Sequence, residues 1–305
     1  MINLLDIDDL NQAEITRILQ LSHLENPPQV LRGKGTALVF EKPSLRTRNS
    51  SEMAIVQLGG YPISIKNEEI GIGTRESVQD IARTLACYHS LIGARVFEHA
   101  KLESMTQALQ ESGLKVPIIN LLSDQAHPSQ ILADLLTLQD HFSNLEDLEI
   151  AYFGDSNNVC KSLVLAAGIY NMKVSVASPP GYELDTHFMD KLERLGFEVN
   201  LTSDPVEAAR GCDVLYTDVW TSMGQEDEAQ KREKIFSPYQ ISNKLLNEAS
   251  PQAMVMHCLP AHRGQEIQAE VIDGPQSLVW QQAKNRMNSF RGFLLWLFET
   301  YPDIG

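Results

Sequence analysis

A group of hydrogen-bond donors follows a short apolar stretch near the N-terminus. Residues 36–40 predict a buried strand, and residues 45–58 predict a helix that begins with the sequence Ser44-Leu45-Arg46-Thr47-Arg48. Ligands of parallel-sheet proteins bind beyond the carboxyl ends of the strands. The N-terminus of a helix offers free N–H groups, and these side chains add hydroxyl and guanidinium donors. The pattern fits a phosphate site, and it also fits an ordinary helix capped by Ser44 with solvated arginines.

A second group combines a histidine with a helix start, in the sequence His127-Pro128-Ser129-Gln130. Proline favours the first turn of a helix, and the helix dipole lowers the pKa of a histidine at that end. A neutral imidazole together with the Gln130 amide suits a small carbonyl or amide group. The alternative is a histidine that caps a purely structural helix.

A third group follows the apolar residues 214–216. Asp218 at an expected strand end, followed by the Ser222-Met223-Gly224 sequence, suits a ligand that carries an ammonium group. The densely charged residues 225–234 predict an exposed, mobile loop, because such a charge run normally faces solvent.

Cys258 ends another apolar stretch, Val255-Met256-His257. A cysteine at the end of a buried strand is usually inert, whereas a nearby carboxylate would make it a hydrogen-bonding or proton-handling group. We expect the neighbouring His257 to point to the opposite face of the strand. Arg286, at the start of an expected terminal helix, is uninformative by itself.

The elements that must position these residues alternate along the chain. A capping box of Asn11 and Glu14 begins the first helix. Strand, loop, helix and strand then follow one another twice, over 36–65 and over 148–177, with a Leu-rich helix predicted over 130–142 and an apolar helix over 281–299. This alternation predicts an α/β protein of two doubly wound domains, each a parallel sheet flanked by helices, joined by interdomain helices.

Composition limits the kinds of ligand and partner. The 305 residues favour two domains. Twenty-five Lys and Arg residues against 40 Asp and Glu residues give a net charge of -15, which argues against nucleic acid and against an anionic membrane surface as partners. The start of the chain lacks the pattern of a signal peptide, and the four cysteines are widely spaced. We therefore expect a reduced, cytoplasmic protein without a metal site.

Taken together, the motifs resemble the aspartate/ornithine transcarbamylase family. Ser44-x-Arg46-Thr47-Arg48, Arg95 and His127-Pro128-x-Gln130 are similar to its carbamoyl-phosphate signature. Later motifs are similar to the ornithine branch: Gly154-Asp155-x-Asn157-Asn158, Asp218-x-x-x-Ser222-Met223-Gly224, His257-Cys258-Leu259-Pro260 and Asn285-Arg286. The seven motifs follow the family order over nearly the whole chain.

The resemblance implies a carbamoyltransferase of arginine biosynthesis, which converts carbamoyl phosphate and L-ornithine to L-citrulline and phosphate. It implies a homotrimer with sites at subunit interfaces and no metal or organic cofactor. It also implies a carbamoyl-phosphate domain over 1–135, completed by the helix 286–305, and an ornithine domain over 136–285.

The resemblance further implies a role for each matching residue. Carbamoyl phosphate would contact Ser44, Leu45, Arg46, Thr47, Arg95, His127, Gln130, Cys258, Leu259 and Arg286. Ornithine would contact Asn158, Asp218, Ser222 and Met223. The catalytic set would be Arg46, Arg95, His127, Asp218 and Cys258. Leu45 replaces a frequent threonine, and Gly71 stands where some relatives carry a side chain that reaches a neighbouring subunit's site.

Other functions compete with this interpretation. Within the family, the acceptor could be putrescine, an acylated ornithine or aspartate, although the Ser222-Met223-Gly224 sequence and Cys258 argue against aspartate. A non-catalytic paralogue is a further alternative, against which the complete set of Arg46, Arg95, His127 and Arg286 argues. A nucleotide-binding oxidoreductase fits poorly, because the loop over 154–158 lacks a Gly-x-Gly-x-x-Gly pattern.

Overall fold

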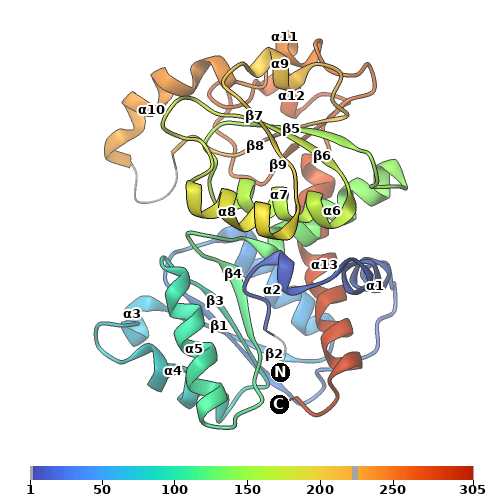
Figure 1. Cartoon of the computed structure of the whole chain (residues 1–305). Coiled ribbons are helices and arrows are strands. Elements are labelled where there is room, and N and C mark those ends of the chain that lie inside the picture. The colour runs from blue at the N-terminus through green and yellow to red at the C-terminus, as the bar shows by residue number, and fades with distance from the viewer. Residues whose placement is uncertain (1–2, 222–225, 305) are drawn as a thin grey trace. The chain divides into compact units, whose positions relative to one another are not determined.

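The computed structural model describes residues 3–221 and 226–304, and the chain divides into two compact units (Figure 1). Unit 1 comprises Met1–Leu136 and Lys284–Gly305, and unit 2 comprises Thr137–Ala283. The chain leaves unit 1 within helix α6 (Pro128–Phe142) and returns within helix α13 (Val279–Thr300). No helix in the described part of the chain is both long and apolar enough to cross a membrane.

The part of unit 1 that the structure describes, residues 3–136 and 284–304, contains four strands and the helices that cover them. The strands are β1 (Gly35–Phe40), β2 (Tyr61–Lys66), β3 (Leu91–Arg95) and β4 (Ile118–Leu122). Besides α6 and α13, the helices are a 3-10 turn (Ile7–Asp9), α1 (Gln12–Ser22), α2 (Leu45–Gln57), α3 (Asn67–Ile70), α4 (Val78–Ala86) and α5 (His99–Glu111). The predicted capping box of α1 is confirmed, because Asn11 and Glu14 exchange hydrogen bonds between side chain and backbone.

The sheet of unit 1 is parallel and has the strand order β2-β1-β3-β4. The chain adds β2 on one side of β1 and then crosses to add β3 on the other side. This reversal creates a switch point at the carboxyl ends of β1 and β3, where the ligands of such sheets bind. Phe40 and Arg95, the last residues of these strands, are paired in the ladder.

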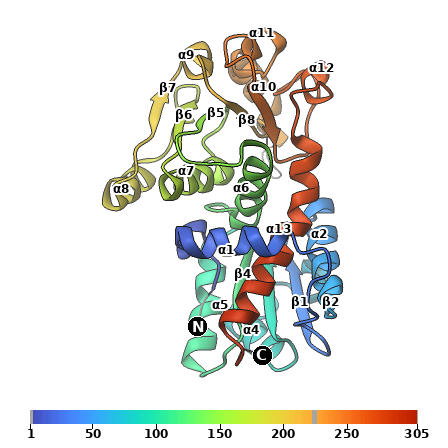
Figure 2. The same cartoon turned by 90° about the vertical axis from the view of Figure 1, so that its right-hand side faces the viewer.

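Helices cover both faces of this sheet. α4 and α5 lie side by side over one face, where Val39, Ile81 and Leu102 share an apolar core (Figure 1). α1 and α13 lie on the opposite side of the strands and cross each other closely (Figure 2). At the crossing, a Cβ atom added to Gly292 would lie 2.5 Å from the Ile18 carbonyl oxygen and 2.1 Å from Ser22 Oγ. The absence of a side chain at Gly292 therefore allows the two helices to approach.

The described residues of unit 2 form five strands with a similar arrangement. They are β5 (Glu149–Phe153), β6 (Lys173–Ala177), β7 (Asn200–Thr202), β8 (Val214–Thr217) and β9 (Met254–His257). The helices are α7 (Asn158–Tyr170), α8 (Thr186–Leu195), α9 (Pro205–Ala209), α10 (Ala229–Phe236), α11 (Asn243–Leu246) and α12 (Ala269–Ile272), with 3-10 turns over Glu226–Glu228 and Ser237–Tyr239.

The sheet of unit 2 is also parallel, with the strand order β7-β6-β5-β8-β9. Its strand order reverses between β5 and β8, so its switch point lies at the carboxyl ends of those two strands. α7 and α8 lie on one side of the sheet, and α9, α11 and α12 lie on the other (Figure 1). The predicted fold class, with a parallel sheet flanked by helices in each half, is confirmed.

One sequence expectation is wrong in unit 2. The sequence predicts an exposed, mobile loop over 225–234, but a 3-10 turn and α10 occupy 226–236; most described side chains of this segment are exposed as predicted. Arg232 is only 3% exposed, because its Nε atom donates to the Trp220 carbonyl oxygen and its Nη2 atom pairs with the Asp155 carboxylate. Its guanidinium also lies over the Phe236 ring, 5.1 Å from the centroid. One residue of this charged segment, Arg232, is therefore buried and attaches α10 to Trp220 and Asp155.

We expect Gly292→Ala to lower the free energy of unfolding by about 1–3 kcal/mol, although alanine normally stabilises a helix. The added methyl group would displace the Ile18 carbonyl and the Ser22 hydroxyl. Urea unfolding followed by circular dichroism measures the change. Adding Ser22→Ala should restore only part of the loss, since the carbonyl remains. Unchanged stability of Gly292→Ala would show that the crossing is not tight.

Candidate functional site

In unit 1, the predicted phosphate residues gather at the switch point between β1 and β3. Ser44 is the N-cap of α2, and its Oγ atom accepts a hydrogen bond from the Thr47 N–H at 3.2 Å. Arg46 follows in the first turn of the same helix and is half-buried, whereas the Leu45 side chain is 74% exposed. Leu45 therefore has only its backbone to offer a ligand at the helix N-terminus.

Two arginines from distant parts of the sequence meet at one hydroxyl group. Arg95 Nη1 lies 3.4 Å from Thr47 Oγ1, and Arg286 Nη2 donates to the same oxygen at 2.9 Å. Arg286 Nη1 also donates to Gln130 Oε1, and Gln130 Nε2 donates to Asp134 Oδ1 at 2.8 Å. We call Thr47, Arg95, His127, Gln130 and Arg286 the cationic site. All five side chains are buried.

The electrostatics of the cationic site favour an anion. Burial lowers the pKa of His127 well below its ordinary value, and the charges of Arg286, Arg95 and Lys42 lower it further. The neutral imidazole predicted from the sequence is confirmed in direction, with burial rather than the helix dipole as the main cause. Burial and Arg95 also lower the pKa of Lys42, a residue without an assigned role in the sequence interpretation.

In unit 2, the predicted carboxylate and thiol lie together beyond the ends of β8 and β9. Cys258 Sγ donates to Asp218 Oδ1 at 2.8 Å, and the Val219 N–H donates to the same oxygen. Asn157 Nδ2 donates to the other carboxylate oxygen, Oδ2, at 2.8 Å. We call Asn157, Asp218 and Cys258 the carboxylate–thiol site. Asp218 and Cys258 are each 9% exposed.

Asn157 is a contributor that sequence reasoning missed. Its Oδ1 atom caps α7 by accepting from the N–H groups of Val159 and Cys160, while its amide holds Asp218. The predicted ligand residue Asn158 is the first residue of α7, and its Oδ1 atom lies 3.1 Å from the Val159 nitrogen. An asparagine directly before an expected helix is a capping signal by which Asn157 could have been found. Ser222 and Met223 lie outside the described residues.

The prediction that His257 points away from Cys258, to the opposite face of the strand, is wrong. A His257 ring nitrogen lies within 4.8 Å of the Asp218 carboxylate and the Cys258 thiol, a set of groups that could hold a metal ion. However, His257 Nδ1 accepts from the Leu259 N–H and Nε2 pairs with Glu266, so a metal would have to displace one of these bonds. The absence of a metal remains a prediction.

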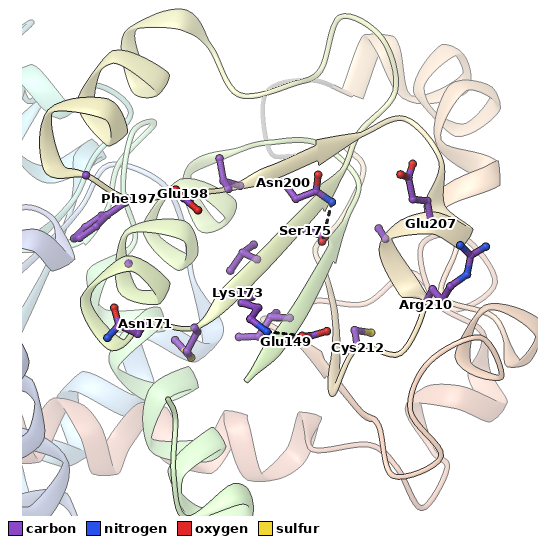
Figure 3. Close-up of a pocket in the computed structure, with 17 residues that line it drawn as sticks. Glu149, Asn171, Lys173, Ser175, Phe197, Glu198, Asn200, Glu207, Arg210 and Cys212 are labelled. Carbon is purple, nitrogen blue, oxygen red and sulfur yellow. Dashed lines mark hydrogen bonds and ion pairs between the residues drawn. The ribbon is translucent and has the colours of Figure 1, made fainter. Parts of the chain in front are cut away.

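A hollow of about 700 Å³ lies elsewhere in unit 2 (Figure 3). Its lining includes the first residues of three strands, Glu149, Lys173 and Asn200. It is therefore at the amino edge of the sheet, opposite the carboxyl ends that carry Asp218. Lys173 is paired with Glu149, and Asn200 is hydrogen-bonded to Ser175. None of the predicted site residues lines it.

The fold and the two groups of side chains define a two-unit α/β protein with the cationic site in one unit and the carboxylate–thiol site in the other. Residues 3–140 match the profile described as "Aspartate/ornithine carbamoyltransferase, carbamoyl-P binding domain". Residues 146–297 match the profile of the "Asp/Orn binding domain" of the same family. The chain belongs to the aspartate/ornithine carbamoyltransferase family.

Individual relatives are similar over nearly their full lengths. An ornithine carbamoyltransferase of Methanocaldococcus jannaschii is 42% identical, with 97% of this chain and 99% of the relative covered. The crystal structure of the Thermus thermophilus ornithine carbamoyltransferase has a TM-score of 0.87 at 41% identity, covering 97% of this chain and 98% of that one. The ornithine carbamoyltransferase structure from Pyrococcus furiosus has a TM-score of 0.89 at 40% identity, covering 96% and 95%.

The lowered pKa of His127 predicts a pH effect on stability. Because the folded pKa lies below the unfolded value of 6.5, the unfolded state alone gains this proton as the pH falls below 6.5. Stability is therefore lost on acidification, by at most about 1 kcal/mol between pH 6.5 and 5.5 for this one group. His127→Gln should show a correspondingly shallower loss than the wild type between pH 6.5 and 5.5 in urea unfolding. The free energy of unfolding of each protein is compared with its own value at pH 8. An equal loss of stability with falling pH in the two proteins would contradict a buried neutral His127.

Proposed function

We propose that the chain transfers the carbamoyl group of carbamoyl phosphate to the side-chain amine of L-ornithine, producing L-citrulline and phosphate. The observation that carries this proposal is the meeting of Arg95 and Arg286 at Thr47 Oγ1 in a buried place. Two guanidinium groups that converge on one buried hydroxyl create a positive potential and a set of donors that suit an anion. The dianionic phosphate of carbamoyl phosphate is such an anion. Two relatives named ornithine carbamoyltransferase each match 97% of this chain.

The proposed carbamoyl-phosphate site uses mainly residues of unit 1. Ser44, Arg46, Thr47, Arg95 and Arg286, with the backbone N–H of Leu45, would hold the phosphate at the N-terminus of α2. Thr47, Arg95 and the neutral His127 would polarise the carbonyl oxygen. Gln130, whose Oε1 atom is oriented by Arg286, and the backbone of Cys258 and Leu259 would receive the carbamoyl amide.

The proposed ornithine site uses residues of unit 2. Asp218 and Asn158 would bind the amino acid together with Ser222 and Met223. A protonated side-chain amine has no lone pair and cannot attack, so it must first lose a proton. Asp218 accepts the Cys258 thiol proton in a hydrogen bond, which leaves the sulfur able to accept from the neutral amine and to orient its lone pair.

The chemistry then needs positioning and electrostatics. The amine nitrogen forms a bond to the carbonyl carbon, the bond from that carbon to the phosphate oxygen breaks, and the amine proton leaves with the phosphate. Negative charge develops on the carbonyl oxygen and on the leaving group, and donors fixed in advance stabilise it. Cys258 acts without a covalent intermediate in this proposal, and no cofactor is required.

Arg46→Ala should lower citrulline formation by roughly 100-fold or more, as expected when a preorganised donor to developing charge is removed. A colorimetric assay of citrulline with both substrates saturating measures this. Arg83→Ala is the matched control, because the Arg83 side chain is 40% exposed and pairs with Asp80 on the surface helix α4. Near-normal turnover of Arg46→Ala would refute the role assigned to the α2 N-terminus.

The acceptor is tested by comparing ornithine, putrescine, N-acetylornithine and aspartate in one assay with carbamoyl phosphate. We expect a clear preference for ornithine, whose α-carboxylate and α-amine putrescine lacks. A preference for another amine would replace the proposed substrate. Transfer to none of them, with carbamoyl phosphate still bound, would support a non-catalytic paralogue.

We further propose the homotrimer that the resemblance implies, with arginine biosynthesis and a cytoplasmic location as its setting. In support, apolar side chains are exposed on α2 and the edge strand β2, where Val56 is 50% and Ile63 is 49% exposed. Gly71 itself has no side chain to offer a neighbouring site. A larger residue at this position would be strained, because its φ is +59° and an added Cβ would lie 2.7 Å from Arg75 Cβ.

Ile63→Asp should weaken the trimer, because a charge would enter an apolar contact. Light scattering after gel filtration should give three times 34.1 kDa for the wild type and a smaller mass for the variant. Tyr88→Asp places the same charge at an exposed aromatic residue outside β2, and this control should keep the wild-type mass. A monomeric wild type would contradict the proposal.

A further inference from the structure

His257 makes three hydrogen bonds although it takes no part in the proposed chemistry. Its Nδ1 atom accepts from the Leu259 N–H at 2.8 Å, and its Nε2 atom lies 3.1 Å from Glu266 Oε1. Its own backbone N–H donates to Gln282 Oε1 at 2.9 Å. His257 is 1% exposed and Glu266 is fully buried. Such a pair is costly to bury, so its function needs an explanation.

These contacts determine the tautomer of the imidazole. Because Nδ1 accepts the Leu259 N–H, it carries a lone pair and no proton. The ring proton therefore resides on Nε2, which donates it to Glu266 Oε1. The same Glu266 oxygen also accepts from the His262 backbone N–H, so the carboxylate is itself fixed in place.

Leu259, whose N–H donates to His257 Nδ1, has an unusual backbone conformation. Leu259 has a φ of +59°, in the left-handed region that residues other than glycine rarely adopt. Such a conformation costs free energy and persists only where the surroundings enforce it. The hydrogen bond to His257 Nδ1 and the packing of the Leu259 side chain against the apolar core of unit 2 both enforce it.

The turn at Leu259 directly follows Cys258, whose thiol donates to Asp218. Any relaxation of Leu259 would change both its own backbone groups and the direction of the thiol. The His257 ring and the Cys258 side chain thus have different tasks, although the residues are adjacent in the chain.

We propose that His257 and Glu266 are positioning residues that hold the Cys258–Leu259 backbone in its active conformation by way of the Leu259 N–H. The inference rests on the proposed function, in which this backbone receives the carbamoyl amide and Cys258 orients the attacking amine. Glu266 orients the ring, the ring orients the Leu259 N–H, and neither residue transfers a proton.

Two substitutions of His257 separate its two ring contacts. His257→Asn places an amide oxygen near the position of Nδ1, so it can still accept from the Leu259 N–H, but it loses Glu266. His257→Gln reaches toward Glu266 but leaves the Leu259 N–H without its acceptor. We expect kcat for citrulline formation to stay within about fivefold of the wild type in His257→Asn and to fall roughly tenfold to a hundredfold in His257→Gln.

Phosphate binding provides an internal control, because the proposed phosphate ligands belong to unit 1. The inhibition constant of inorganic phosphate against carbamoyl phosphate should therefore be unchanged in both variants. Thermal unfolding of both variants checks that they are folded. An equal loss of kcat in His257→Asn and His257→Gln, with both folded, would overturn the proposal.

Glu266 distinguishes positioning from proton transfer. Glu266→Gln keeps an oxygen that can accept from His257 Nε2–H and from the His262 N–H, so we expect near-normal kcat and an unchanged pH profile. Glu266→Ala should lower kcat roughly tenfold or more, since it leaves these buried donors unsatisfied. A shifted pH profile in Glu266→Gln would instead favour a charge relay and overturn the proposal. His262→Ala is the matched control, because only the backbone of this exposed residue contacts Glu266.

The tautomer can be read without any activity measurement. Histidine ¹⁵N chemical shifts of the full-length protein should show the Nε2–H form for His257 in the wild type and in Glu266→Gln. A protonated Nδ1 in the wild type would overturn the inference while leaving the proposed function intact. Conversely, a wild type that carries the Nε2–H tautomer but forms no citrulline would refute the proposed function and, with it, the catalytic purpose of this positioning.

Discussion

The accumulation of buried positive charge beyond β1 and β3 is the constraint on which the rest of the protein depends. Arg95 and Arg286 meet at the Thr47 hydroxyl, and their charges, together with burial, keep His127 neutral. Like charges in a poorly solvated place repel, so the fold must hold them there by packing. The crossing of α1 and α13 at Gly292 provides such packing, since Arg286 lies on the same helix. A protein with a net charge of -15 thus keeps a local cluster of buried positive charge at this place.

Unit 2 is built on the same kind of parallel sheet, but its switch point carries a carboxylate instead of arginines. Its strand order also reverses, and the loops at its switch point carry an amide and a carboxylate. Asp218 is held by Asn157, Val219 and Cys258, so its two oxygens have defined directions before any amine arrives. The buried charged groups around Asp218 have positioning tasks. Arg232 anchors α10 to Asp155, and the His257–Glu266 pair supports the turn at Leu259. Preorganisation of this kind reduces the cost of orienting groups during the reaction.

The elements of the fold could be predicted closely because their signals are local. The strand, loop, helix and strand predicted over 148–177 form as β5, α7 and β6, where Asn157 caps α7 and the buried Val174 and Val176 alternate along β6. Residues 225–234 misled the sequence interpretation because a charge run normally faces solvent. Tyr182 and Asp155, which are distant in the sequence, and Phe236 on the same helix together make a buried position favourable for Arg232. The supporting residues Asn157 and Glu266 escaped assignment for the same reason: their partners are 61 and 9 residues away.

The sequence by itself determined the family, the parallel α/β architecture, and the charged side chains proposed here to contact the substrates. These follow from residue types in order along the chain, because alternation, capping and motif spacing are properties of short segments. Only the tertiary structure decided that Arg286 reaches Gln130 and Thr47, that Cys258 donates to Asp218 rather than to His257, and that His257 instead supports Leu259. Hydrogen bonds depend on distances and angles of tenths of an ångström and a few degrees, and long-range packing alone sets these.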